Sequence, residues 1–311
     1  MSTNELSISV IICTRDRPKD LVHCLRSINN QSVVPEDIVV VIGSPDSCPL
    51  GIRDHFPNMK IQVLECFENN ISLSRNVGLA STHSEIVLFI DDDAVAHPGW
   101  IAAYKSLFEM LPETWIAGGP VFDSRVNPPV YEFKQGMITS YGTQLPVSSK
   151  PPESLKSTYR LTVKGCNFAV RREKALFVGG FDPFFRFAFD ETDLVFAMYK
   201  ANGIVQYCQD AVVDHAHTPG HYRQTGPMDH DWRVEYASHA MFILKHNSPK
   251  MQRKGRWILR RRYLKLVFIA LVCVFKGKAS ISKGVTSLKE ARLGIRDATQ
   301  SIQNQSESLP R

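Results

Sequence analysis

The sequence has no CxxC cysteine pair, no long apolar run and no leader-like start. Its seven cysteines are scattered, which argues against a zinc site or a disulfide framework and is typical of a reduced compartment. No stretch reaches the roughly 20 apolar residues that a membrane-spanning helix needs. The polar start MSTNELS lacks the basic-then-apolar layout of a signal peptide. We therefore expect a cytoplasmic protein.

Acidic residues are also absent from one long segment, residues 250–278, which holds ten lysines and arginines. In the rest of the chain acids outnumber bases, although the formal net charge of the whole is +6. Ten apolar residues at 266–275 follow the basic cluster. Three interpretations stay open: a core-packing helix with a solvated basic start, a peripheral element on the anionic inner face of the cell membrane, and a nucleic-acid contact. The last is the least favoured, because no recognition fold accompanies the basic run.

Short apolar runs alternate with helical periodicity over the first two hundred residues. Strands that are apolar on both faces and alternate with amphipathic helices are typical of a mostly parallel sheet flanked by helices. We expect strands at 6–14, 37–43, 60–65 and 85–90, another within 160–173 and a strand pair within 204–217. We expect helices within 15–31, 72–82 and 98–111, and a further helix that ends at Gly203. We also expect an irregular insertion over the site at 123–160. The sequence predicts one α/β domain over 1–220 and a mainly helical, basic extension over 221–311.

Polar residues follow several of these strands. Thr14, Asp46 and the triplet Asp91–Asp93 lie at or just after predicted strand ends. Ligands bind beyond the carboxyl ends of the strands in such sheets, so these residues mark one rim. Clustered carboxylates suit a hard divalent cation, and a helix N-cap is the structural alternative.

Two further groups of residues are candidates for acid–base catalysis and for metal binding. Asp190 and Glu191 lie at a predicted helix start after an aromatic loop, where an acid is either structural or a general base with a raised pKa. Alternation places His215 and His217 on one side of a strand, so either imidazole could complete a metal site begun by Asp93. The guanidinium of Arg75 could hold a phosphate or a carboxylate, or be a solvated helix charge.

Four stretches in this order resemble the family 2 glycosyltransferases, which use nucleotide sugars and have the GT-A fold, a Rossmann-like sheet. They are SVIICTRDRPKDLVHCLRSINNQ, SRNVGLASTHSEIVLFIDDDAV, KGCNFAVRRE with VGGFDPFF, and FDETDLVFAMYKANG, and they span roughly residues 7 to 217.

The resemblance implies roles for individual residues. Asp91–Asp93 match the DXD element: Asp93 would bind Mg²⁺ or Mn²⁺, and Asp91 and Asp92 would reach the ribose and the sugar. Glu191 falls on the catalytic-base position, with Asp190 as its competitor because Asp is usual there. The other residues of the implied donor site are Thr14, Arg15, Arg75, Gly165, Cys166 and Asn167.

One departure concerns the donor nucleotide. The family commonly ends its second strand with an Asp-Asn pair, and Val41 and Ile42 stand at those positions. Asp46 is the expected substitute, and a UDP-sugar is the favoured donor.

The sequence thus predicts a metal-dependent, inverting glycosyltransferase that builds a surface glycan or glycolipid on a glycan or lipid-linked acceptor. A nucleotidyltransferase on a related fold and a non-catalytic nucleotide-sugar-binding protein are the alternatives.

Overall fold

The computed structural model describes residues 5–133, 135–145, 159–220, 222 and 228–307. The chain divides into two compact units. Unit 1 comprises Met1–Met137, Leu145–Pro183 and Asp190–Thr218, and unit 2 comprises Ile138–Gln144, Phe184–Phe189 and Pro219–Arg311. No helix among the described residues is both long and apolar enough to cross a bilayer.

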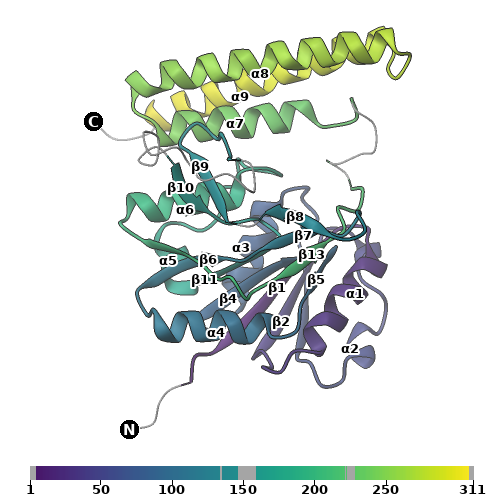
Figure 1. Ribbon diagram of the computed structural model, residues 1–311, viewed down its shortest axis with the longest axis vertical. Coiled ribbons are helices and arrows are strands. Elements are labelled where there is room, and N and C mark those ends of the chain that lie inside the picture. The colour runs from purple at the N-terminus through teal and green to yellow at the C-terminus, as the bar shows by residue number, and fades with distance from the viewer. Residues whose placement is uncertain (1–4, 134, 146–158, 221, 223–227, 308–311) are drawn as a thin grey trace. The chain divides into compact units, whose positions relative to one another are not determined.

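Unit 1 is built on a seven-stranded sheet with the order β12-β6-β11-β4-β1-β2-β3 (Figure 1). All neighbouring pairs in it are parallel except those of β11, which runs antiparallel to β4 and β6. This is the mostly parallel α/β sheet predicted from the sequence. The strands are β1 (Ile8–Thr14), β2 (Asp37–Ile42), β3 (Ile61–Glu65), β4 (Ile86–Asp91), β6 (Thr114–Gly118), β11 (Asn167–Arg171) and β12 (Ile204–Tyr207).

Helices cover this sheet because its strands are apolar on both faces. Val10 and Ile12 of β1 share a core with Trp100. On the opposite face, Gly78 lies so close to Ile11 that a Cβ there would come within 2.7 Å of its side chain. The helices are α1 (Pro18–Asn29), α2 (Ile52–His55), α3 (Ile71–Ser81), α4 (Trp100–Met110), α5 (Arg172–Phe177) and α6 (Asp190–Lys200), with a 3₁₀ turn η1 (Pro45–Ser47).

A second sheet has four strands in the order β5-β13-β7-β8, and β5, β7 and β13 follow β4, β6 and β12 in the chain. Its strands are β5 (Ala94–Ala96), β7 (Val121–Asp123), β8 (Val130–Phe133) and β13 (Val213–His215). It changes two expectations. The pair expected within 204–217 does not pair, because β12 joins the first sheet and β13 the second. The segment 123–160 is not irregular throughout, since β8 pairs antiparallel with β7 and residues 136–139 form β9 (Gly136–Thr139). Residues 146–158 of that segment lie outside the described residues.

The strand expected within 160–173 is two strands, β10 (Tyr159–Thr162) and β11. The break between them at residues 163–166 places Gly165 and Cys166 in a loop.

Unit 2 is mainly helical. It contains α7 (Trp232–His246), α8 (Pro249–Phe275) and α9 (Ile281–Glu307) (Figure 1). Buried Tyr236 and Ala291 share a core with Leu266, Ala270 and Cys273 of α8. The helical C-terminal region is therefore confirmed, while the boundary between residues 220 and 221 stays a prediction.

Candidate active site

The sheet register brings Thr14 and Asp91–Asp93 of the predicted rim together. β1 and β4 run parallel with Cys13 opposite Asp91, so both strands end at one edge. Thr14 ends β1, and Asp91 ends β4, with Asp92 and Asp93 in the turn that leads to β5. Asp92 and Asp93 are buried, whereas Asp91 is half-buried. The rim is therefore formed by the elements that the sequence indicated.

Arginine 17 compensates the middle of the carboxylate triplet. Its Nε donates to Oδ2 of Asp92 at 3.0 Å, and its Nη1 donates to Oδ2 of Asp93 at 3.1 Å. The Thr14 hydroxyl adds a hydrogen bond to Asp92 at 2.7 Å. Burial raises the pKa of Asp92 to about 7, although Arg17 and Thr14 oppose the rise. The guanidinium of Arg17 thus offsets part of the repulsion between the three adjacent carboxylates, and the sequence analysis did not identify this residue.

Arg75, from α3, compensates the other side of the triplet. Its guanidinium is buried, pairs with Asp190 and contacts Oδ1 of Asp91 at 3.3 Å. It also donates to the carbonyl of Gly165 at 2.8 Å. The predicted residues Arg75, Asp91, Gly165 and Asp190 therefore lie in one cluster, and the reading of Arg75 as a solvated helix charge is excluded by its burial.

His215 lies between two carboxylates. Its Nε2 is 3.3 Å from Oδ1 of Asp93, and its Nδ1 is 3.1 Å from Oε2 of Glu132. Burial lowers the pKa of His215, but Cys166, Asp93 and Glu132 outweigh burial and raise that pKa to about 12. In turn, burial raises the pKa of Asp93, but His215 and Arg17 outweigh it and lower that pKa to about 2.

Glu132, on β8, connects both histidines. Its Oε2 also lies 2.7 Å from Nε2 of His217, and its Oε1 is 2.8 Å from Nζ of Lys164. The Nε2 of His217 therefore faces Glu132, whereas the Nε2 of His215 faces Asp93. The structure thus distinguishes the two imidazoles that the sequence could not separate.

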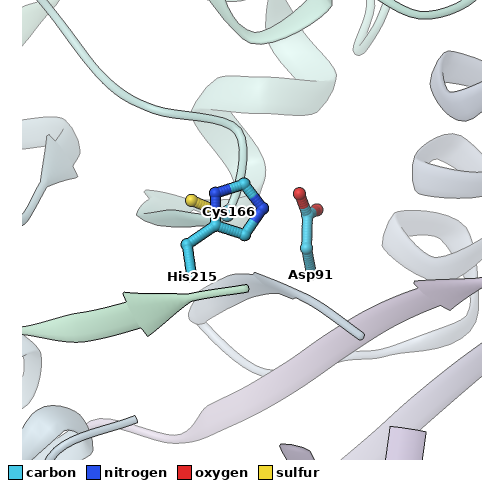
Figure 2. Close-up of side chains that lie close together, drawn as sticks. All are labelled: Asp91, Cys166 and His215. Carbon is cyan, nitrogen blue, oxygen red and sulfur yellow. The ribbon is translucent and has the colours of Figure 1, made fainter. Parts of the chain in front are cut away.

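The side chains of Asp91, Cys166 and His215 lie close together (Figure 2). Their ligand-type atoms all lie within 4.8 Å of one another. Asp93 approaches the same imidazole. The Asp91 carboxylate and the His215 imidazole, with the Asp93 carboxylate against that imidazole and the Cys166 thiol beside it, are donors that suit a divalent transition metal such as Mn²⁺. The residues present therefore fit the cation that the sequence analysis expected.

Asn167 occupies a different environment from the one expected. Its side chain is fully buried, and its amide nitrogen donates to the carbonyls of Pro120 and Ala211 at 2.9 and 2.7 Å. Its amide oxygen accepts from the Trp100 indole at 2.8 Å and the Tyr104 hydroxyl at 2.9 Å. All four hydrogen-bonding positions of the amide are used. The side-chain amide of Asn167 thus makes its hydrogen bonds within the core, and the expectation that Asn167 lies beside the transferred sugar stays a prediction.

Asp190 and Glu191 open α6 but differ in environment. Asp190 is buried against Arg75, whereas Glu191 is half-buried. Burial raises the pKa of Asp190 well above its ordinary value, Arg75 opposes the rise and Glu191 adds to it. A Cβ on Gly165 would lie 3.6 Å from Oε2 of Glu191, so this carboxylate reaches the loop that carries Cys166.

Arg15 and Asp46 lie at the ends of β1 and β2. The side chain of Arg15 packs on Gly43, where a Cβ would come within 2.7 Å of its Nε, and its Nη2 donates to the carbonyl of Phe67 at 2.6 Å. Asp46 is exposed on η1. Neither residue contacts the carboxylate cluster through a hydrogen bond or an ion pair within the described part of the chain.

Three functional candidates were missed from the sequence: Arg17, Glu132 and Lys164. Arg17 carries a usable signal, since the uncompensated triplet required a cation and Arg17 follows the first strand closely. Glu132 and Lys164 carry none, because their pairing depends on β8 and on the loop before β11.

Known proteins share this sequence pattern. The model of the family "Glycosyl transferase family 2" matches residues 9–190, more than half of the chain. Glucosyl-dolichyl phosphate glucuronosyltransferase of Haloferax volcanii is 28% identical over 181 residues, 57% of this chain and 56% of that protein. Succinoglycan biosynthesis protein ExoM of Rhizobium meliloti is 26% identical over 230 residues, 68% of each chain. The amylovoran glycosyltransferase AmsE of Erwinia amylovora matches over 45% of its length, so the chain spans about half of the first and last of these relatives.

Solved structures share the fold. The mannosyltransferase PcManGT of Pyrobaculum calidifontis, in complex with GDP-Man and Mn²⁺, is similar with a TM-score of 0.56 and 16% identity, over 94% of this chain and 88% of that one. Residues 1–349 of S. aureus TarS in complex with UDP give a TM-score of 0.55 and 15% identity, over 95% and 92%. These neighbours confirm the GT-A fold expected from the sequence. Since the family model covers most of unit 1, the chain belongs to glycosyl transferase family 2.

Proposed function

We propose that this chain is a metal-dependent, inverting glycosyltransferase that moves a sugar from a nucleotide-sugar donor to a glycan or lipid-linked acceptor. The observation that carries the proposal is the cluster of Asp91, Cys166 and His215 at one rim of the sheet, with Asp93 against the same imidazole. Glu191 reaches Gly165, the residue before Cys166. The named activities of the relatives, a transferase acting on glucosyl-dolichyl phosphate and a protein of succinoglycan biosynthesis, support the acceptor class.

The metal would be held by Asp93 and His215, with the Asp91 carboxylate facing the same imidazole. When bound, it would stabilise the negative charge of the departing nucleoside diphosphate. Mn²⁺ fits this set better than Mg²⁺, because Mg²⁺ strongly prefers oxygen ligands and one ligand here is an imidazole. Arg17 keeps Asp92 and Asp93 in place by neutralising part of their mutual repulsion.

Glu191 is the proposed general base. The acceptor hydroxyl must lose a proton as it attacks the anomeric carbon, and a carboxylate near the reacting atoms can take that proton. Asp190 is buried and held by Arg75, which favours a structural role for it. One base acting on the face opposite the leaving group gives inversion at the anomeric carbon.

The donor is bound between the rim and the ends of β1 and β2. Thr14 contacts Asp92 and Arg75 contacts Asp91, so both would line the donor site at the rim. Arg15 and Asp46 would contact the nucleotide. A UDP-sugar remains the favoured donor. Gly165 lines the side nearest Glu191.

The test is a thermal-shift screen of the full chain against UDP-, GDP-, dTDP- and CMP-sugars with and without Mn²⁺, followed by donor cleavage assays. We expect one nucleotide class to raise Tm in the presence of Mn²⁺, and at 100 times its Kd such a ligand adds about 2.7 kcal/mol. Glu191→Gln should keep the shift and lose cleavage, whereas Glu36→Gln, which substitutes an exposed acid just before the amino end of β2 and so at the opposite edge of the sheet, should change neither. A donor that binds but is never cleaved by the unmodified chain, with or without acceptor glycans, would identify a sensor instead of an enzyme.

A further inference from the structure

Helix α8 has two apolar faces, and only one of them packs within unit 2. The packed face carries five buried residues, namely Gly255, Leu259, Leu266, Ala270 and Cys273. A Cβ on Gly255 would lie 2.2 Å from Ile243 of α7, so the two helices approach closely there. This face of α8 packs as the buried face of an ordinary core helix does.

The opposite face presents large apolar side chains to solvent. They are Trp257, Leu264, Phe268, Leu271 and Phe275, and their exposed fractions run from 54% for Trp257 to 93% for Phe275. Steps of seven, four, three and four residues keep them within an arc of about 60° on a helix of 3.6 residues per turn. We call these five residues the exposed stripe. Its length and continuity separate it from the scattered apolar residues of an ordinary protein surface.

Basic side chains border the exposed stripe on both sides. By helical position Arg253 and Arg260 lie along one edge, and Lys254, Arg261 and Lys265 lie along the other. All five are exposed, and residues 250–278 contain no acid. The guanidinium of Arg261 lies 4.7 Å from the ring centroid of Trp257, so apolar and cationic groups meet at one end of the stripe.

We propose that the exposed stripe binds an anionic phospholipid surface, with the axis of α8 parallel to it. An apolar strip would enter the acyl boundary while the basic borders meet the headgroups, and tryptophan suits the headgroup level. The positive charge of the borders determines which partner fits the exposed stripe. A second copy of α8 would bring cationic borders against cationic borders, which disfavours self-pairing. An anionic bilayer complements both the apolar strip and its borders.

This inference is independent of the proposed transferase activity, because lipid binding needs neither donor nor metal. It would place the chain at the surface where a lipid-linked acceptor resides. Two of the interpretations left open by the sequence for residues 250–278 then hold together. One face of the helix packs in the core, and the other lies on the membrane surface.

The experiment is co-sedimentation of the full chain with vesicles of phosphatidylglycerol and phosphatidylcholine in equal parts, compared with pure phosphatidylcholine. We expect binding to the anionic vesicles that weakens as salt is added. Leu264→Asn with Phe268→Asn, and separately Arg260→Glu with Arg261→Glu, should each weaken binding by at least about ten-fold. All four side chains are exposed, so these variants should fold, which circular dichroism checks.

Matched controls distinguish the effect of the exposed stripe on vesicle binding from the effects of net charge and of general surface hydrophobicity. Lys289→Glu with Arg296→Glu makes the same charge change on exposed positions of α9, and Val34→Asn with Met110→Asn removes exposed apolar groups from unit 1. Both controls should bind as the unmodified chain does. No binding to anionic vesicles, or equal losses in the stripe and control variants, would overturn the proposal. So would a dimer in light scattering that dissociates when the stripe is substituted, because a second copy would then occupy it.

Discussion

Asp190 and Glu191 are neighbours in the chain but have opposite surroundings, and this difference bears on which one is the base. Asp190 is buried in an ion pair with Arg75, while Glu191 is half-buried beside Gly165. Removing one partner of a buried pair leaves an uncompensated charge. Loss of activity alone cannot distinguish the two acids, because either substitution disturbs the site.

Stability can distinguish them. We expect Asp190→Asn to lower the free energy of unfolding by about 3 kcal/mol, since Arg75 loses its closest counter-ion. Glu191→Gln should change it by less than about 1 kcal/mol, because this half-buried side chain forms no ion pair among the described residues and glutamine keeps its size. Urea denaturation measures both. Equal stability losses in the two variants would contradict the assignment of Asp190 as structural and Glu191 as base.

Glu132 is a positioning residue in the proposed metal site. Its carboxylate lies within hydrogen-bonding distance of Nδ1 of His215, and this contact keeps Nε2 of the same ring directed at Asp93. Carboxylates that orient a ligating histidine typically contribute about 10- to 100-fold to metal affinity.

We therefore expect Glu132→Gln to weaken Mn²⁺ binding by roughly 10-fold or more, measured by the loss of free Mn²⁺ signal in electron paramagnetic resonance. Glu113→Gln, at an exposed position, is the control and should bind as the unmodified chain does. Unchanged Mn²⁺ affinity in the Glu132 variant would show that His215 needs no such support.

Helix α9 approaches α7 without space for a side chain at Gly294. A Cβ there would lie 2.1 Å from the carbonyl oxygen of Arg233, whereas at Gly284 the nearest atom would be 3.5 Å away. Both glycines lie in the same helix, where alanine is favoured over glycine by about 1 kcal/mol. The two positions thus separate packing from helix propensity.

Accordingly, Gly294→Ala should destabilise the chain by about 2 kcal/mol through overpacking, while Gly284→Ala should leave it unchanged or more stable. Thermal unfolding followed by circular dichroism gives both values. If the two substitutions shift Tm in the same direction, the close approach of α7 and α9 is wrong.

His239 links α7 to α8 as a neutral imidazole. Its Nε2 donates to the carbonyl of Tyr141 at 2.7 Å, and its Nδ1 accepts from Arg262 at 2.6 Å. Burial lowers its pKa from 6.5 to about 4, and Arg262 adds to the effect. A proton on this ring would place a second cation beside Arg262.

The folded state therefore binds this proton more weakly than the unfolded chain. The stability that His239 contributes is present above pH 6.5 and is lost as the pH falls from 6.5 towards 4. The loss should approach about 3 kcal/mol, and His239→Gln should flatten this part of the pH profile. Urea titrations at several pH values measure the slope. An identical slope in the variant would contradict a buried neutral His239.

The elements that the sequence predicted best are those with a local signal. The strands at β1, β2 and β4 are continuously apolar, and the helix face of Leu21, Cys24, Leu25 and Ile28 is buried as its spacing indicates. Strands β5, β7 and β8 are only three or four residues long and are specified by their partners, so periodicity could not find them. In α8 the sequence showed apolar residues all round, and only packing determined which face is buried.

Across the whole chain, the family, the sheet and the rim could be read from motifs, while the pairing of charges could not. Arg17 meets Asp92 and Asp93 from 75 and 76 residues away, and Glu132 meets His215 from 83. Such contacts depend on chain folding over long sequence separations. The hydrogen-bond partners of Asn167 could not be predicted for the same reason, since Pro120 and Ala211, whose carbonyls accept from its amide, lie 47 and 44 residues away.

The central claim is that the carboxylates at the end of β4 and His215 bind a divalent cation that holds a nucleoside diphosphate. Calorimetric titration of UDP, GDP and dTDP into the full chain, with and without Mn²⁺, tests it directly. We expect one of them to bind at least about ten-fold more tightly with Mn²⁺, and Asp93→Asn to abolish the difference while Glu191→Gln preserves it. Equal affinity with and without Mn²⁺, or a metal effect that survives in Asp93→Asn, would contradict the claim.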